Sequence, residues 1–163
     1  MTLQRILCPI DIYDSCAETL RFASELCLSS SAELHVLYVV EDFVIPGIGI
    51  QLSLVNISSD IEYRTAQNII VNIISRFVSS SLTAHSIIRR GNTPFQIIHE
   101  ALEKNIDLII LSRKNRTMTE ELLFPSVTDA VIHRAPCATL VIPQESSKSV
   151  EETAVREYDW NER

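Results

Sequence analysis

The stretch Arg5-Ile-Leu-Cys-Pro-Ile10, followed directly by Asp11, is a short apolar run with the length of a buried strand. Strands written as unbroken apolar runs are buried on both faces, which is typical of parallel sheets. Similar runs recur along the chain at Glu33 to Val40, Ala84 to Arg89, Leu108 to Leu111 and Ala138 to Ile142. The pattern therefore predicts five parallel strands, the last of them stopped by Pro143.

Each connection between these runs shows helical periodicity. Ser15-x-x-Glu18 has the capping-box pattern, and Cys16, Leu20, Ala23 and Cys27 follow at helical spacing. Ser59-x-x-Glu62 opens a second helix, whose core face we expect to comprise Ala66, Ile69, Ile70, Ile73, Ile74 and Phe77.

Two further helices complete the pattern. One begins at Thr93-Pro94, with proline at the first helical position, and the other at Pro125-Ser126, with Val127, Ala130 and Val131 on its apolar side. Right-handed crossovers then give an α/β fold, a three-layer doubly wound domain. No second domain or internal repeat is visible in the sequence.

Composition restricts the class of protein. The 163 residues have the length of one domain, and 46% of them are hydrophobic, enough to cover both faces of a sheet. The net charge of −7 argues against a nucleic-acid partner and against docking on an anionic membrane surface. No stretch approaches the ~20 apolar residues of a membrane span, and no secretory signal is evident. We expect a cytoplasmic protein.

Two segments lie outside the strand and helix pattern. Phe43 to Ile57 is a long apolar connection, which is interpreted as a lid, a surface for a protein partner, or a disordered loop. We expect the domain to end at residue 143. Residues 144–163 form a polar tail, either flexible or with a short docked helix around Val150 to Tyr158.

The four cysteines and four histidines give no metal-binding pattern. Cys8, Cys16, Cys27 and Cys137 fall in apolar stretches, so we interpret them as buried thiols that act as small hydrophobic side chains. His35, His85, His99 and His133 stand apart in the sequence, none at ligand spacing from another, and no metal site is expected.

Asp11 is the first candidate for a binding site. In an open parallel sheet, ligands bind at the carboxyl ends of the strands, where the strand order reverses. Asp11 follows the first strand directly, and Leu111-Ser112-Arg113 ends the fourth. A carboxylate there can accept hydrogen bonds from a ribose or a base edge. The alternative is that Asp11 or Asp14 caps the first helix.

The order of elements and the motifs resemble the universal stress proteins over roughly residues 3 to 143. The resembling pieces, in order, are Ile6-Leu-Cys-Pro-Ile-Asp11, Ala32-Glu-Leu-His-Val-Leu-Tyr-Val-Val40, Gly91-Asn-Thr-Pro94, Asp107-Leu-Ile-Ile-Leu111, Ser126-Val-Thr and Ala135-Pro-Cys137. The resemblance implies a five-stranded sheet of order 3-2-1-4-5 and a homodimer formed through the last strand, Ala138 to Ile142. It also implies a nucleotide site, with ATP or AMP as the candidate ligand, formed by Asp11, Val40, Ser112, Asn115, Ser126 and Val127.

The phosphate-binding part of that site departs from the family pattern. ATP-binding members carry Gly-x2-Gly-x9-Gly-[Ser/Thr], and the same spacing here falls on Ser112, Asn115, Pro125 and Ser126. Glycine supplies positive φ and lets backbone N–H groups approach phosphates, whereas proline has no N–H to donate. Losing one hydrogen bond to a charged group costs about 1.5–3 kcal/mol, or about ten- to a hundredfold in affinity.

The neighbouring charges in this loop act in opposite directions. Arg113, Lys114 and Arg116 can contact phosphates through their side chains, or form a solvated basic loop. Glu120 and Glu121 weaken any attraction for phosphate.

Three hypotheses of function follow. The first is a non-catalytic stress-response protein that works as a homodimer, with weak or no ATP binding. The second is an ATP- or AMP-binding regulator with slow or no hydrolysis, in which Asp11 holds the ribose or base and Ser126 the phosphate. The third, an enzyme of another kind, has little in its favour, because the sequence shows no Ser-His-Asp order, paired carboxylates or activated cysteine.

Overall fold

The five apolar runs form five strands in the computed structural model, which describes residues 2–12, 16–41, 56–114 and 126–144. A helix lies in each of the four connections, so the predicted alternation is confirmed. In chain order the elements are β1 (Arg5–Pro9), α1 (Ala17–Ser30), β2 (Glu33–Val40), α2 (Asn56–Phe77), β3 (Ala84–Arg90), α3 (Thr93–Glu103), β4 (Leu108–Lys114), α5 (Val127–Ile132) and β5 (Ala138–Gln144).

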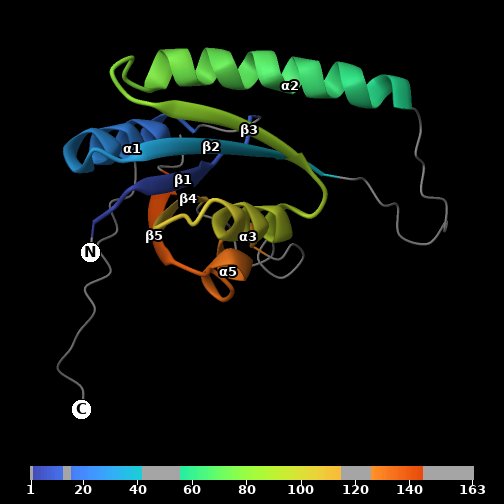
Figure 1. The fold of residues 1–163 in the computed structure, drawn as a ribbon. Helices are drawn as coiled ribbons and strands as arrows, with labels where there is room; N and C mark the ends of the chain where they lie inside the picture. Colours follow the sequence, from blue (N-terminus) through green and yellow to red (C-terminus); the bar gives the residue numbers. More distant parts are fainter. Residues whose placement is uncertain (1, 13–15, 42–55, 115–125, 145–163) are drawn as a thin grey trace, which may run out of the picture.

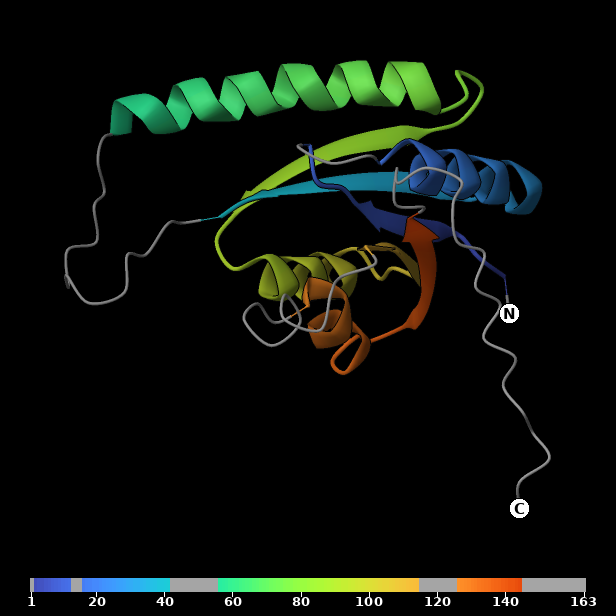
Figure 2. The ribbon, with the colours of Figure 1, turned by 180° about the vertical axis from the view of Figure 1, so that it is seen from behind.

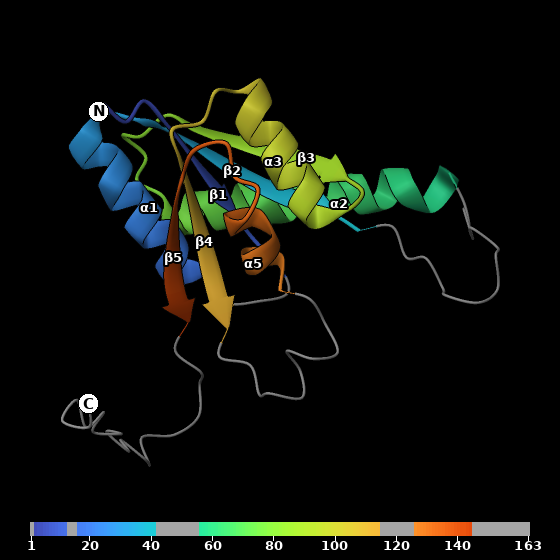
Figure 3. The same cartoon turned by 90° about the horizontal axis from the view of Figure 1, so that it is seen from below.

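The strands form one parallel sheet in the order β3-β2-β1-β4-β5. In its centre, Leu7 of β1 pairs with His35 of β2 on one side and with Ile109 of β4 on the other. Figure 3 shows β4 and β5 running side by side in the same direction. The predicted fold class and strand order are therefore confirmed, and β3 and β5 are the two edges of the sheet.

Helices α1 and α2 cover one face of the sheet (Figure 1). The predicted stripes of both helices face the sheet: Leu20, Ala23 and Cys27 of α1 are fully buried, as is Ile70 of α2. Burying a leucine-sized side chain stabilises the fold by about 1.5–3 kcal/mol. The remaining stripe residues are buried or half-buried, namely Cys16, Ala66, Ile69, Ile73, Ile74 and Phe77.

Helices α3 and α5 cover the opposite face (Figure 2). Ile97 of α3 and Val131 of α5 pack in the same cluster as Leu7 of β1. The neighbours of Leu7 in the strand, Ile6 and Cys8, point to the first face. Because both faces of the central strands are covered, polar side chains that reach a ligand must come from the strand ends.

The helix starts differ in part from the prediction. Ser15 lies outside the described residues, and Cys16 stands at the N-cap of α1 without a side-chain cap hydrogen bond. Helix α2 begins at Asn56, three residues before the predicted Ser59 start. Asn92 caps α3, its Oδ1 accepting from Phe95 N at 3.2 Å, so Pro94 occupies the second helical position rather than the first.

Two strands run further than the apolar pattern predicts. β4 continues beyond Leu111 to Lys114, and β5 passes through Pro143 to Gln144. The two extensions pair with each other, Arg113 opposite Pro143. An edge strand tolerates proline because a backbone N–H that faces away from the sheet has no partner to lose. The prediction that Pro143 stops the strand is therefore wrong.

The residue that precedes β4 fastens it to β1. Asp107 Oδ2 accepts hydrogen bonds from Gln4 N at 2.8 Å and from Arg5 N at 2.9 Å. These backbone hydrogen bonds hold the pKa of Asp107 below its usual value. Since β1 and β4 are aligned at their starts, their carboxyl ends come to the same edge of the sheet.

The described cysteines are reduced thiols. Cys8, Cys16 and Cys27 are buried, as predicted, and Cys137 is half-buried. Burial raises the pKa of Cys27 to about 11, so it is protonated and unreactive near neutral pH. No helix in the described ranges is both long and apolar enough to cross a membrane.

Two predicted segments fall largely outside the description. Of residues 43–57, only Asn56 and Ile57 are described, and they form the start of α2. Of residues 144–163, only Gln144 is described, as the last residue of β5. The interpretations of both segments stay predictions.

Candidate functional site

The carboxyl ends of β1, β2 and β4 lie beside one another because β1 is hydrogen-bonded to both other strands. Asp11 is exposed two residues after β1, while Ile10 N still donates to Leu37 O of β2 at 2.8 Å. Val40 is the last residue of β2, and Ser112 lies in the last part of β4; both are half-buried. The structure thus places Asp11, Val40 and Ser112 together on the side of the sheet where the strands have their carboxyl ends.

Helix α5 is fastened to the same end of β4. Thr128 Oγ1 donates to the backbone oxygen of Ser112 at 3.1 Å, and Thr128 is buried. Ser126 caps the helix, its Oγ accepting from Asp129 N at 3.3 Å. Ser126 and Val127 are therefore held near Ser112 through the first turn of α5. The Ser126 hydroxyl already has a partner inside the protein, which reduces its availability to a ligand.

The end of β2 is held by the turn that leads into α3. Gly91 N donates to Val40 O at 2.9 Å, and Gly91 adopts a φ of 126°, which side chains rarely allow. Thr93 Oγ1 donates to Glu41 Oε1 at 2.5 Å. These contacts fix the direction in which the chain leaves β2 beside Val40.

The model of the universal stress protein family matches residues 2–143 of this chain. The chain belongs to the universal stress protein family. The match covers every described strand and helix except the last residue of β5. At the level of its family, the chain is therefore a stress-response protein.

Individual members show how far the similarity extends. The universal stress protein MJ0531 of Methanocaldococcus jannaschii is 25% identical over 139 residues, which are 85% of this chain and 81% of that protein. The structure of the hypothetical protein MJ0577 superposes with a TM-score of 0.72 at 22% identity, covering 90% of this chain and all of the other.

Two similar structures hold nucleotides. A universal stress protein in complex with cAMP has a TM-score of 0.61 at 16% identity and covers 88% of this chain and 98% of its own. A universal stress protein of Archaeoglobus fulgidus in complex with dAMP has a TM-score of 0.57 at 23% identity and covers 87% and 99%. At these identities the structural likeness shows the shared fold alone.

The positions that carry glycine in ATP-binding universal stress proteins are only partly described. Ser112 lies inside β4, opposite Ile142 of β5, and not in a loop after the strand. Asn115 and Pro125 lie outside the described residues. Arg113 is exposed at the end of β4. The binding role of all six candidate residues stays a prediction.

Two residues near this edge have roles that the sequence pattern did not indicate. Thr128 was part of a motif, but its hydrogen bond to Ser112 depends on how α5 packs on β4. His133, at the end of α5, donates from Nδ1 to Asp129 O at 2.8 Å. His133 is the C-cap of α5, and this bond gives its side chain a structural partner there.

The expectation that the four histidines are isolated is wrong for two of them. His35 and His85 are 50 residues apart, yet β2 and β3 pair them directly, with ring centroids 4.9 Å apart. Burial and the neighbouring His85 lower the pKa of His35, so its imidazole is neutral at pH 7. Sequence spacing misses this pair because strand register is set by the fold.

A buried ion pair lies beneath α3. The Arg89 guanidinium of β3 bonds Glu100 and Glu103 of α3, and Nη1 contacts His99 Nδ1 at 3.1 Å. Glu100 is only 1% exposed, whereas the Arg89 side chain is 21% exposed. The Arg89 hydrogen bond lowers the pKa of Glu103. The pair joins α3 to the carboxyl end of β3, where Arg89 lies opposite Val39 of β2.

Proposed function

We propose that this chain is a non-catalytic stress-response protein that works as a cytoplasmic homodimer and binds ATP weakly or not at all. The observation that carries the proposal is an intact family fold whose phosphate-loop positions are Ser112, Asn115 and Pro125 instead of glycine. The fold brings the carboxyl ends of the strands together, but these residues lack the positive φ of glycine, and proline also lacks the backbone N–H that a phosphate would accept.

The described residues on either side of the phosphate loop support the proposal that phosphate binds only weakly. Ser112 adds a side chain at a position inside β4, where the backbone is already paired with β5. Helix α5 has six residues, so it gathers few aligned peptide dipoles at its start. Ser126 already accepts a hydrogen bond from Asp129 N. Each of these features lowers the attraction for an anion.

Nucleotide titration tests the proposal directly. We expect isothermal titration of the full chain with ATP, ADP and AMP to give dissociation constants well above micromolar, or no heat at all. Submicromolar binding of any of the three would contradict the proposal, since it requires a phosphate or base site stronger than these residues provide.

A second candidate function is that of an ATP- or AMP-binding regulator with slow or no hydrolysis. Two similar universal stress proteins are described in complex with cAMP and dAMP, and both ligands carry a single phosphate. Such a ligand depends less on a triphosphate loop and more on the contacts to base and ribose. Exposed Asp11, beside Val40 at the strand ends, is the residue that can accept hydrogen bonds from a ribose.

Replacement of Asp11 separates the two functions. If AMP binds, Asp11→Ala should weaken it by about ten- to a hundredfold, because a hydrogen bond to a charged group contributes about 1.5–3 kcal/mol. Glu25→Ala on α1, an exposed carboxylate far from the strand ends, is the matched control and should bind like the wild type. An AMP affinity that Asp11→Ala leaves unchanged refutes the role of Asp11.

The dimer is proposed to form through β5. This edge strand has no strand partner on its outer side among the described residues, and Leu140, Val141 and Ile142 are only half-buried. Apolar edge strands are usually paired or covered. We also propose that residues 43–57 bind a protein partner, through a surface separate from the β5 dimer interface.

Light scattering measures the assembly. We expect a mass of twice the 18.4 kDa chain, and a shift toward the monomer in Ala138→Lys, which places a charge on the exposed start of β5. Leu28→Lys, on an exposed position of α1, is the control and should stay dimeric. A wild-type protein that is monomeric at all concentrations would rule out the dimer.

A further inference from the structure

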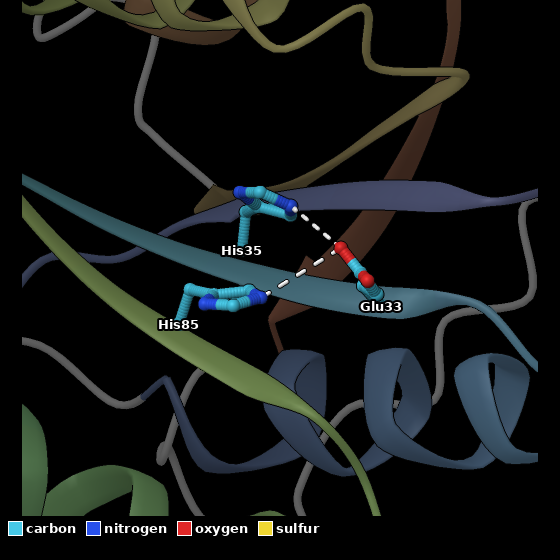
Figure 4. Close-up of side chains that lie close together, drawn as sticks. All are labelled: Glu33, His35 and His85. Carbon is cyan, nitrogen blue, oxygen red and sulfur yellow. Dashed lines mark ion pairs between the residues drawn. The ribbon is translucent and has the colours of Figure 1, made fainter.

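Three potential metal ligands meet near the amino ends of β2 and β3, at the opposite end of the strands from Asp11. Glu33 and His35 are alternate residues of β2, so their side chains emerge on the same face. His85 of β3 pairs with His35 and lies on that face too. Figure 4 shows both imidazoles directed toward the Glu33 carboxylate. We call Glu33, His35 and His85 the histidine cluster.

The distances within the histidine cluster suit a small cation. Glu33 Oε2 is 3.8 Å from His35 Nε2 and 3.7 Å from His85 Nε2, and one ligand atom from each residue lies within 4.8 Å of the others. Zinc bonds nitrogen at about 2.0–2.1 Å and carboxylate oxygen at about 2.0–2.2 Å, which sets ligand atoms about 3.3–3.5 Å apart in a tetrahedron. The two Glu33 distances exceed this spacing by a few tenths of an ångström, and movement of the half-exposed Glu33 and His85 side chains toward buried His35 would bring the three ligand atoms together around an ion.

The environment of His35 points to a missing partner. Its side chain is 8% exposed, and neither ring nitrogen has a hydrogen-bond partner among the described residues. Separations of 3.7–3.8 Å are too long for hydrogen bonds, so Glu33 does not satisfy either imidazole. A buried polar group without a partner costs about 1–3 kcal/mol, and a bond to a cation removes that cost at Nε2.

Two imidazoles and one carboxylate select among cations. Mg²⁺ and Ca²⁺ prefer oxygen ligands, whereas imidazole suits zinc and its neighbours in the first transition row. His85 and Glu33 are about half exposed, at 47% and 51%, so an ion can enter from solvent and keep a water as its fourth ligand. His35 forms the buried floor of the cluster.

We propose that the histidine cluster binds one Zn²⁺ ion through Glu33 Oε2, His35 Nε2 and His85 Nε2, with solvent completing the coordination. The bound ion links β2 to β3, an edge strand that pairs with only one other strand of the described sheet. Zinc therefore stabilises this edge of the sheet. The site is independent of the nucleotide edge, so it stands whether or not the protein binds AMP.

Titration of the chelator-treated full chain with ZnCl₂ tests the proposal. We expect one equivalent to bind, MgCl₂ to give no heat, and the thermal unfolding midpoint to rise with Zn²⁺. His85→Ala and Glu33→Gln alter half-exposed side chains and should leave the fold intact. Loss of an outer-shell partner typically costs 10–100-fold in metal affinity, so loss of a direct ligand should cost at least about tenfold.

The control separates this site from other zinc ligands in the chain. His133→Ala removes an exposed histidine outside the histidine cluster and should bind Zn²⁺ like the wild type. Co²⁺ bound to the cluster should show no thiolate charge-transfer bands, since the proposed ligands are nitrogen and oxygen. The proposal is overturned by absence of Zn²⁺ binding, by equal affinity in His85→Ala, or by thiolate bands that persist in that variant.

Discussion

Replacement of Arg89 by methionine is expected to lower the free energy of unfolding by about 3–5 kcal/mol, because it leaves the buried Glu100 carboxylate without its cation. Glu100 is 1% exposed and bonds Arg89 from the middle of α3. Its other oxygen, Oε1, already lacks a hydrogen-bond partner among the described residues. Arg89 is therefore the main group that offsets the cost of burying this charge.

Urea unfolding measures the effect. Arg64→Met, on an exposed position of α2, is the matched control and should change stability by no more than about 0.5 kcal/mol. The double variant Arg89→Met/Glu100→Leu should recover much of the loss, because an apolar pair of similar size commonly replaces a buried ion pair without penalty. If the single variant is as stable as the wild type, the pair does not stabilise α3 on the sheet.

The fold could be predicted because the central strands are buried on both faces and therefore appear in the sequence as continuous apolar runs. Ile6 and Cys8 face one helix layer and Leu7 the other, so β1 reads as a continuous apolar run. The same criterion fails at the strand ends. The apolar run of the fourth strand ends at Leu111, yet pairing with β5 carries β4 through Ser112 and Arg113 to Lys114.

For the candidate site, the sequence could predict only the positions of residues at or just beyond the end of a strand. Asp11 and Val40 come to the same edge because parallel strands end together. Thr128 could not be assigned, since its bond to Ser112 depends on the packing of α5 against β4. The same limit applies to the histidine cluster, whose members meet through the register of β2 and β3.

The buried ion pair between Arg89 and Glu100 could not be predicted from the sequence either. Arg89 and Glu100 are separated by a turn and most of α3, and nothing in their spacing marks them as partners. Burial makes the pair strong, and burial at these positions follows from α3 lying over β2 and β3. Polar residues inside a three-layer fold therefore need the structure before they can be given a role.

Restoring glycine at the three phosphate-loop positions is expected to raise the affinity for ATP by about ten- to a hundredfold. The variant is Ser112→Gly/Asn115→Gly/Pro125→Gly. Pro125→Gly returns a backbone N–H that can donate to a charged phosphate oxygen, a bond that contributes about 1.5–3 kcal/mol. The other two changes remove side chains and permit positive φ, which phosphate-binding loops use.

The three substitutions should not contribute equally. Pro125→Gly restores a missing donor and should give most of the gain, whereas asparagine already tolerates the left-handed region, so Asn115→Gly should give little. Ser112→Gly carries a penalty, because Ser112 lies inside β4 and glycine in a strand costs about 0.5–1 kcal/mol relative to alanine. Affinity must therefore be compared at a temperature where every variant is fully folded.

Titration of ATP into the wild type, the Pro125→Gly single variant and the triple variant gives the comparison. Pro136→Gly, an exposed proline in the connection between α5 and β5, controls for general loosening of the backbone and should bind ATP as the wild type does. Equal affinity in the wild type and the triple variant would mean that the lost glycines do not limit binding. The proposed weak binding would then have to originate at Asp11, the residue proposed to contact the base or ribose.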